Sequence, residues 1–426
     1  MQVSAWKARD RNVCTLLVLA VIGRALTWVV ISVAASSLPL FDSSPKLVLD
    51  ESTPPWISAL LRWDAFHFAH VAEKGYVYEH EWAFFVGTPF TMRVSSKLLS
   101  LLGGRYTSST WATFLQGGAL TAIACDSTRI LYHLSLHHLR SPNLAFVSAA
   151  LSLLPSSPAT LKFASYSEPF FTYLSYKGLL ACSHSQWFFA SICFTLAGAF
   201  RSNGFMLCGF ILWGMLVDPF LRGKKSSLTL PRIAYTTILV ALPIVPFIQH
   251  NYTAYRAFCS STQIPTWCNR SIFPLIYSHV QSKYWNVGLL RYWTLQNIPN
   301  FIIALPVLLN LFTFSAFYIP RVPSILWGLL HEKHKDIDRT QAVPKSPFLS
   351  PSLLPHTIHA FLLTLILTLA AHTQTALRAL PCLPITYWAA ARLLVEHPKW
   401  GKAWVVWSII WGAISCVLWA VFLPPA

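Results

Sequence analysis

The sequence predicts an all-α protein that crosses a membrane many times as a single domain. Of its 426 residues, 54% are hydrophobic and only 11% are charged, and the mean hydropathy is +0.50. Helices that face lipid can be apolar all round, whereas a soluble domain of this length needs more polar surface. The formal charge of +17 comes from Lys and Arg scattered in short loops, without the basic stripe expected of a nucleic-acid site. The composition therefore argues against a soluble domain and a nucleic-acid partner.

The first apolar run, 13–35, is long enough to cross a bilayer and carries Arg24 within it. Lys7, Arg9 and Arg11 precede this run, so the positive-inside rule predicts a cytosolic N-terminus, and we expect no cleavable signal peptide. A cation is costly in lipid, and Arg24 is therefore expected to face the interior of the bundle.

Ten further apolar runs bring the expected number of spans to eleven. They cover 110–135, 143–161, 168–183, 186–200, 203–218, 232–249, 299–319, 353–371, 379–395 and 403–422. A long first loop at 36–109 separates the first two spans. A second long loop covers 250–298, and a polar insert covers 321–352.

The positions of Lys and Arg support this threading. Loops on the expected cytosolic side, the insert 321–352 included, hold Arg140, Arg222, Lys224, Lys225, Arg321, Lys333, Lys335, Arg339, Lys345, Lys399 and Lys402. Short loops on the other side hold single bases, namely Lys162, Arg201 and Arg378. Because short cytosolic loops are enriched in Lys and Arg, the two long loops are expected on the luminal side.

Two glycosylation sequons, at Asn251 and Asn269, both fall in the second long loop. Cys259 and Cys268 lie between them. Glycan acceptors and a disulfide both require a non-cytosolic face, which agrees with the charge pattern. Two sequons also arise by chance in a chain of this length, and the two cysteines fit a disulfide or free thiols equally well. The cysteines within spans, such as Cys125, Cys193 and Cys208, are expected to be small buried apolar residues.

Most of the unusual polar residues fall on the expected luminal side, and Asp64 has the strongest case for chemistry among them. A helical reading puts Asp64 and His67 on one side, three residues apart and beside aromatic groups. A carboxylate in such surroundings suits a general base, although Asp is also a common helix N-cap. The nearby Trp and Tyr residues fit either interfacial anchoring or stacking on a sugar or polyprenyl chain. His67, His70 and His80 match no compact set of metal ligands, so no metal is expected.

Three later segments add polar residues to the same side. Glu168 opens a span beside Tyr166, where it fits either a substrate contact or a complement to the helix dipole. Arg201 and Asn203 lie between two spans, as a tight turn or as a phosphate-binding site, because a guanidinium binds phosphate bidentately. Gln249 ends the span that precedes the second long loop.

Several of these motifs together resemble the PIG-V family of mannosyltransferases. The resemblance rests on Arg62-Trp63-Asp64, Tyr166-Ser167-Glu168, Arg201-Ser202-Asn203-Gly204, Pro265-Thr266-Trp267-Cys268 and others in the same order along the chain. It implies a GT-C type glycosyltransferase of the endoplasmic reticulum membrane. The implied reaction transfers the second, α-1,6-linked mannose from dolichyl phosphate mannose to the GPI anchor precursor in the lumen, without a cofactor.

The resemblance also implies roles for residues. Asp64 would act as the catalytic base of an inverting displacement, with His67 as its helper or as a donor ligand. We expect the remaining candidates to orient sugar, phosphate or glycolipid: Arg62, Trp63, Glu79, His80, Glu81, Tyr166, Glu168, Arg201, Asn203 and Gln249. Three alternatives stay open, namely another acceptor for the same donor, a non-catalytic subunit of glycolipid assembly, and a transporter. A requirement for a small partner subunit in the membrane also stays open.

Overall fold

The computed structural model describes residues 2–103, 109–223, 228–260, 264–269, 274–324 and 346–423, which form helices and loops with no strand among them. Six helical segments in this part of the chain are long and apolar enough to cross a membrane. They are Asp10–Ser37, Ser202–Leu221, Leu230–Phe258, Leu295–Ser324, Pro351–Ala370 and Pro398–Ala420, and shorter apolar helices cover Pro142–Leu151 and Trp187–Gly198. The chain is therefore a multi-pass membrane protein.

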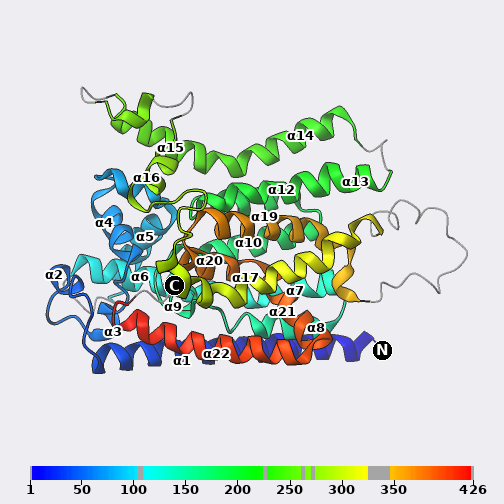
Figure 1. Ribbon diagram of the computed structural model, residues 1–426, viewed down its shortest axis with the longest axis horizontal. Coiled ribbons are helices and arrows are strands. Elements are labelled where there is room, and N and C mark those ends of the chain that lie inside the picture. The colour runs from blue at the N-terminus through cyan, green and yellow to red at the C-terminus, as the bar shows by residue number, and fades with distance from the viewer. Residues whose placement is uncertain are drawn as a thin grey trace, which may run out of the picture.

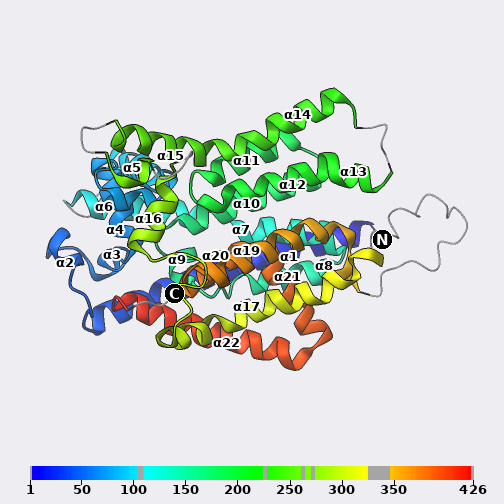
Figure 2. The same cartoon turned by 45° about the horizontal axis from the view of Figure 1, so that its top comes forward.

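The long helices run side by side along the longest axis of the molecule (Figure 1). α1 (Gln2–Ser37) packs on α22 (Pro398–Ala420), and α10 (Ser167–Ser183) packs between α7 (Ser127–Leu139) and α11 (Trp187–Gly198). α14 (Leu230–Ala241) lies at the opposite edge of the bundle from α22 in both views (Figures 1 and 2). α17 (Ile298–Tyr318), α19 (Leu354–Ala370) and α21 (Pro384–Glu396) complete the large central core.

Several expected spans are broken into shorter helices. The run at 110–135 divides into α6 (Thr110–Ala124) and α7, because Asp126 caps the start of α7 by accepting from the Arg129 amide. Arg24 turns inward and donates to the Cys125 carbonyl at this break, at 2.9 Å. The run at 143–161 divides into α8 (Pro142–Leu151) and α9 (Pro158–Lys162) around Pro155.

Two other segments stay helical throughout but change helix type along their length. The segment after η2 (Ser202–Leu207) passes through α12 (Cys208–Leu212), a π-helical turn at Trp213–Val217 and α13 (Asp218–Leu221). Pro243 sits in a 3-10 turn between α14 and α15 (Val245–Phe258). α15 continues to Phe258, well into the stretch that the sequence predicted as the second long loop.

The described parts of the two long loops gather at the end of the bundle that lies away from the N-terminus (Figure 1), which we call the loop end. The first contains α2 (Pro45–Val48), α3 (Pro55–Ser58), α4 (Asp64–Lys74), η1 (Glu79–Ala83) and α5 (Gly87–Leu101). The second contains η6 (Thr266–Asn269), α16 (Ile276–Tyr284) and η7 (Leu295–Asn297). Most of the predicted insert at 321–352, with Lys333, Lys335, Arg339 and Lys345, lies outside the described residues, as do Lys224 and Lys225.

Candidate active site

Asp64 is the first residue of α4, at the loop end of the bundle. The residue before it, Trp63, has a φ of 51°, a left-handed conformation that is strained for a large side chain. Such strain persists where the surroundings fix it, and here the residue before Trp63 is held through both its backbone and its side chain. The Tyr166 hydroxyl donates to the Arg62 carbonyl at 2.7 Å, and the Arg62 guanidinium donates to the Ala420 carbonyl at 2.8 Å.

Arg62 itself is buried, and its hydrogen bonds go to backbone carbonyls. Besides Ala420 it donates to the carbonyls of Trp419, Ser58 and Leu61, at 3.2, 2.6 and 2.9 Å. The cation therefore ties the end of α22 to the turn that carries Asp64. The sequence analysis placed Arg62 among the residues that orient substrate, whereas in the structure its guanidinium lies behind Asp64 and binds backbone carbonyls.

Four charged side chains meet beside this turn, and we call them the charge cluster: Asp64, Glu168, Arg201 and Arg378. Arg378, in the last turn of α20 (Thr373–Ala379), donates through Nη2 to Asp64 Oδ2 at 2.7 Å and through Nε to Glu168 Oε1 at 3.0 Å. Arg201 Nη1 donates to the same Oε1 at 2.5 Å. Two carboxylates thus balance two guanidinium groups, which is the condition for keeping charges at a partly buried position.

The two carboxylates of the charge cluster differ in access. Glu168 is fully buried at the start of α10, and one of its oxygens accepts from both arginines. The Asp64 side chain is 24% exposed and contacts only one of the arginines in these ion pairs. Glu168 therefore holds the arginines in place, while Asp64 is the carboxylate that an incoming molecule can reach.

Arg201 lies in the closely packed turn that follows α11. A Cβ on Gly204 would lie 2.5 Å from the Gly198 Cα, so only glycine fits there. The turn presents Asn203 to Arg201, whose Nε donates to Asn203 Oδ1 at 3.4 Å. The hydrogen bonds described here use two of the five N–H donors of each arginine in the charge cluster, and a phosphate accepts from donors of this kind.

Arg378 is the member of the charge cluster that the sequence interpretation missed. It was counted only as a single base in a short loop on the expected luminal side. The available signal was that same position, because a lone Arg between two apolar runs on the side of Asp64 needs a carboxylate partner.

His67 lies one turn along α4 from Asp64 and packs among rings. It stacks on Phe84 with ring centroids 4.6 Å apart and meets His80 edge-on at 5.2 Å. Burial lowers the pKa of His67 against an opposing effect of Asp64, which favours the neutral imidazole. A neutral ring can accept a proton or a hydrogen bond from a substrate hydroxyl.

The other acidic candidates of the first loop hold the loops together. Glu81 is 1% exposed, pairs with His70 and accepts from the backbone amides of Val77 and Tyr78 at 2.8 and 2.9 Å. Its contacts brace the loop from within. Gln249 is exposed on α15, and its side chain is not among the described contacts of the charge cluster.

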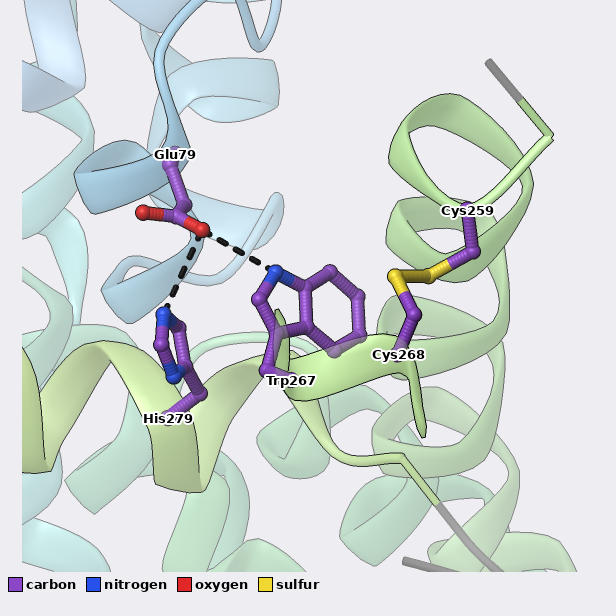
Figure 3. The surroundings of a disulfide bond; sticks show 5 residues. All are labelled: Glu79, Cys259, Trp267, Cys268 and His279. Atoms are coloured by element: carbon purple, nitrogen blue, oxygen red, sulfur yellow. Dashed lines mark hydrogen bonds and ion pairs between the residues drawn. A yellow bond between two sulfur atoms is a disulfide. The ribbon is translucent and has the colours of Figure 1, made fainter. Parts of the chain in front are cut away.

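Glu79 joins the first long loop to the second. Its Oε1 accepts from Trp267 Nε1 at 3.0 Å and lies 3.3 Å from His279 Nε2, as Figure 3 shows. Its Oε2 accepts from Lys283 Nζ at 2.6 Å and from the Tyr284 hydroxyl at 2.7 Å. Burial raises the pKa of Glu79, but these hydrogen bonds outweigh it and hold that pKa below its ordinary value.

A disulfide between Cys259 and Cys268 anchors the same region, with the two Cα atoms 5.8 Å apart (Figure 3). It fastens η6, which carries Trp267, to the end of α15.

The neighbouring sequons differ in how far their asparagine side chains are exposed. Asn269 is exposed. Asn251 is 3% exposed within α15, where Nδ2 donates to the Phe247 carbonyl and Oδ1 accepts from the Tyr277 amide. The structure therefore argues against the predicted glycan at Asn251, because its amide is engaged and covered.

Known proteins match this chain over most of its length. The model of the family described as Mannosyltransferase (PIG-V) matches residues 11–426. A GPI mannosyltransferase 2 of Cryptococcus neoformans is 31% identical over 96% of this chain and 98% of its own length. A GPI alpha-1,6-mannosyltransferase 2 of Rattus norvegicus is 32% identical over 83% of this chain and 78% of its own. A GPI mannosyltransferase 2 of Aspergillus fumigatus is 31% identical over 92% and 87%. No solved structure matches the chain.

Proposed function

The chain belongs to the Mannosyltransferase (PIG-V) family, and we propose that it adds the second, α-1,6-linked mannose to the GPI anchor precursor. The names of relatives that match nearly the whole chain support this acceptor and linkage. The observation that carries the proposal is the charge cluster, in which a reachable carboxylate lies beside two guanidinium groups at the loop end of a membrane bundle. Transfer of a sugar from a lipid phosphate needs a base for the acceptor hydroxyl and cations that bind the phosphate.

The proposed donor is dolichyl phosphate mannose, and the proposed mechanism inverts the anomeric carbon. Asp64 takes the proton of the acceptor hydroxyl, and the hydroxyl oxygen attacks the anomeric carbon of mannose. The bond from that carbon to the phosphate oxygen breaks, and its electron pair leaves with dolichyl phosphate. Arg378 and Arg201 stabilise the phosphate as negative charge moves onto it, which lowers the barrier because the donors are already oriented.

We further propose a GT-C architecture with eleven spans in the endoplasmic reticulum membrane, a cytosolic N-terminus and the charge cluster on the luminal face. The broken helices α6–α7 and α8–α9 supply spans that no single long helix makes. Both long loops and the exposed Asn269 then lie in the lumen. At the membrane surface, both lipid-borne substrates reach Asp64 from the bilayer.

The acceptor is tested by the lipid that accumulates when the reaction stops. Cells that lack their own enzyme are supplied with the wild-type chain or with Asp64→Asn, and their mannolipids are separated after labelling with radioactive mannose. The proposal expects the GPI precursor with one mannose to accumulate with Asp64→Asn and to be extended with the wild type. Accumulation of an N-glycan precursor instead would assign the chain to another acceptor of the same donor.

A further inference from the structure

We infer that the rings at the junction of the two long loops bind a hexose ring of the acceptor glycan. These rings belong to Tyr78, His80, Tyr284 and Trp285, and we call them the ring cluster. The inference rests on the proposed function, since it assigns a subsite to the acceptor of that reaction. It also gives the second long loop, which the charge cluster does not use, a direct contact with substrate.

The ring cluster lies next to the residues that surround Asp64. His67, one turn along α4 from Asp64, meets His80 at 5.2 Å and Trp285 at 6.4 Å between ring centroids. Arg378 contacts Asp64 from another element, α20. The base therefore lies between guanidinium groups that suit a phosphate and rings that suit a sugar, which is the order that donor, base and acceptor require.

The rings form a continuous surface that is partly open to solvent. Tyr78 and His80 are parallel, with 9° between their planes and 5.7 Å between centroids, and His80 is 5.7 Å from Tyr284. Tyr78 is 55% exposed and Tyr284 is 44% exposed. Ring faces pack on the C–H surface of a hexose, while imidazole and phenol groups hydrogen-bond with its hydroxyls. A hexose uses both the ring faces and these polar groups, whereas an apolar polyprenyl chain would leave the hydroxyl and imidazole groups without a partner.

The ring cluster is held in position from both sides of the site. Glu79 accepts from the hydroxyl of Tyr284 and from Lys283, which fixes the end of α16 on the first loop. The Trp285 carbonyl accepts from His372 Nε2 at 2.6 Å, immediately before α20, the helix that carries Arg378. Because Lys283 is paired with Glu79, the cation nearest the rings is already neutralised. A neutral polar ligand therefore fits better than an anion.

Exposed Trp and Tyr also anchor proteins at the membrane interface, and kinetics separate the two roles. The reaction is measured in detergent with dolichyl phosphate mannose and the one-mannose GPI precursor, varying each substrate in turn. The variants are Tyr78→Ala, Tyr284→Ala and Tyr284→Phe, the last of which keeps the ring and loses the bond to Glu79. Tyr252→Ala is the control, because Tyr252 is an exposed tyrosine on α15 outside the ring cluster.

The inference expects each alanine variant of the ring cluster to raise the acceptor KM by about three- to tenfold, the effect of losing one aromatic stacking contact. The donor KM and the control stay within about twofold of wild type on the same scale. Tyr284→Phe, which keeps the stacking ring, raises the acceptor KM less than Tyr284→Ala does. An equal rise in donor KM, an unchanged acceptor KM, or an equal loss with Tyr284→Phe overturns the inference. Failure of the proposed function looks different, because the wild-type protein then transfers no mannose to this acceptor.

Discussion

At the level of single residues, Asp64 and Glu168 are two carboxylates that differ in burial, and we expect them to differ in role. Both contact Arg378, yet Glu168 is inaccessible and shared by two guanidinium groups, whereas Asp64 is 24% exposed. A buried carboxylate with two charged partners cannot be removed without leaving unpaired cations inside the protein. We therefore expect stability to depend on Glu168, while the proposed mechanism assigns the chemistry to Asp64.

This division predicts unequal effects of two isosteric substitutions. Glu168→Gln leaves Arg201 and Arg378 with one carboxylate between them and is expected to cost on the order of 3 kcal/mol of stability. Asp64→Asn removes a partly solvated charge and is expected to change stability much less, because solvent screens it. Thermal unfolding of both variants in the same detergent checks this. Equal destabilisation by the two variants would make Asp64 a structural counter-ion.

At the level of elements, a few contacts fix the turn that carries Asp64 and dock the second long loop on the first. Arg62 and Tyr166 fix the turn before α4, and Glu79 fixes α16 and η6 on η1. The disulfide Cys259–Cys268 limits how far η6 can move from α15. These contacts place the ring cluster relative to Asp64 although the segments are far apart in the chain.

Glu79 is accordingly expected to control the order of α16. Glu79→Ala removes the acceptor shared by Lys283, Tyr284 and Trp267, and amide hydrogen exchange in 276–284 should rise while α10 stays protected. Glu73→Gln is the matched control, since Glu73 lies in the same loop and bonds Trp111 on α6. Unchanged exchange in α16, or an equal rise with Glu73→Gln, would contradict this role for Glu79.

At the level of the whole molecule, the sequence predicted that four charged residues share one side of the bundle but not how their side chains pair. Alternation of short basic loops put Asp64, Glu168, Arg201 and Arg378 on one side, and the structure brings them into contact there. The family, identified from motifs, is confirmed by the match over 11–426. The partner of Asp64 lies 314 residues away in sequence, so the sequence could indicate that Arg378 needs a carboxylate but only the packing of α20 shows which one.

The helix breaks and the burial of loop residues could not be predicted from the sequence either. Apolar runs give the same hydropathy whether a helix is continuous or broken, and α8 and α9 part around Pro155 within one run. The resemblance placed Glu81 and Arg62 among the residues that orient substrate. Their burial follows from tertiary packing against His70 and the end of α22.

Orientation in the membrane gives a prediction at the same scale. If the second long loop is luminal, Asn269 is exposed and available for glycosylation, whereas the buried amide of Asn251 is not. Asn269→Gln should abolish the mobility shift caused by endoglycosidase, and Asn251→Gln should leave it unchanged. A shift that depends on Asn251 alone would contradict the structure of α15, and the absence of any glycan in the wild type would contradict the luminal placement.

Transfer of radiolabelled mannose from dolichyl phosphate mannose to the GPI precursor decides whether Asp64 is the base of the reaction. Wild type, Asp64→Asn and the control Glu73→Gln are compared at equal amounts of folded, membrane-inserted protein. Loss of a general base lowers the rate by about 100- to 10,000-fold, so Asp64→Asn should show that loss while Glu73→Gln stays near wild type. Wild-type rates with Asp64→Asn would remove Asp64 from the mechanism.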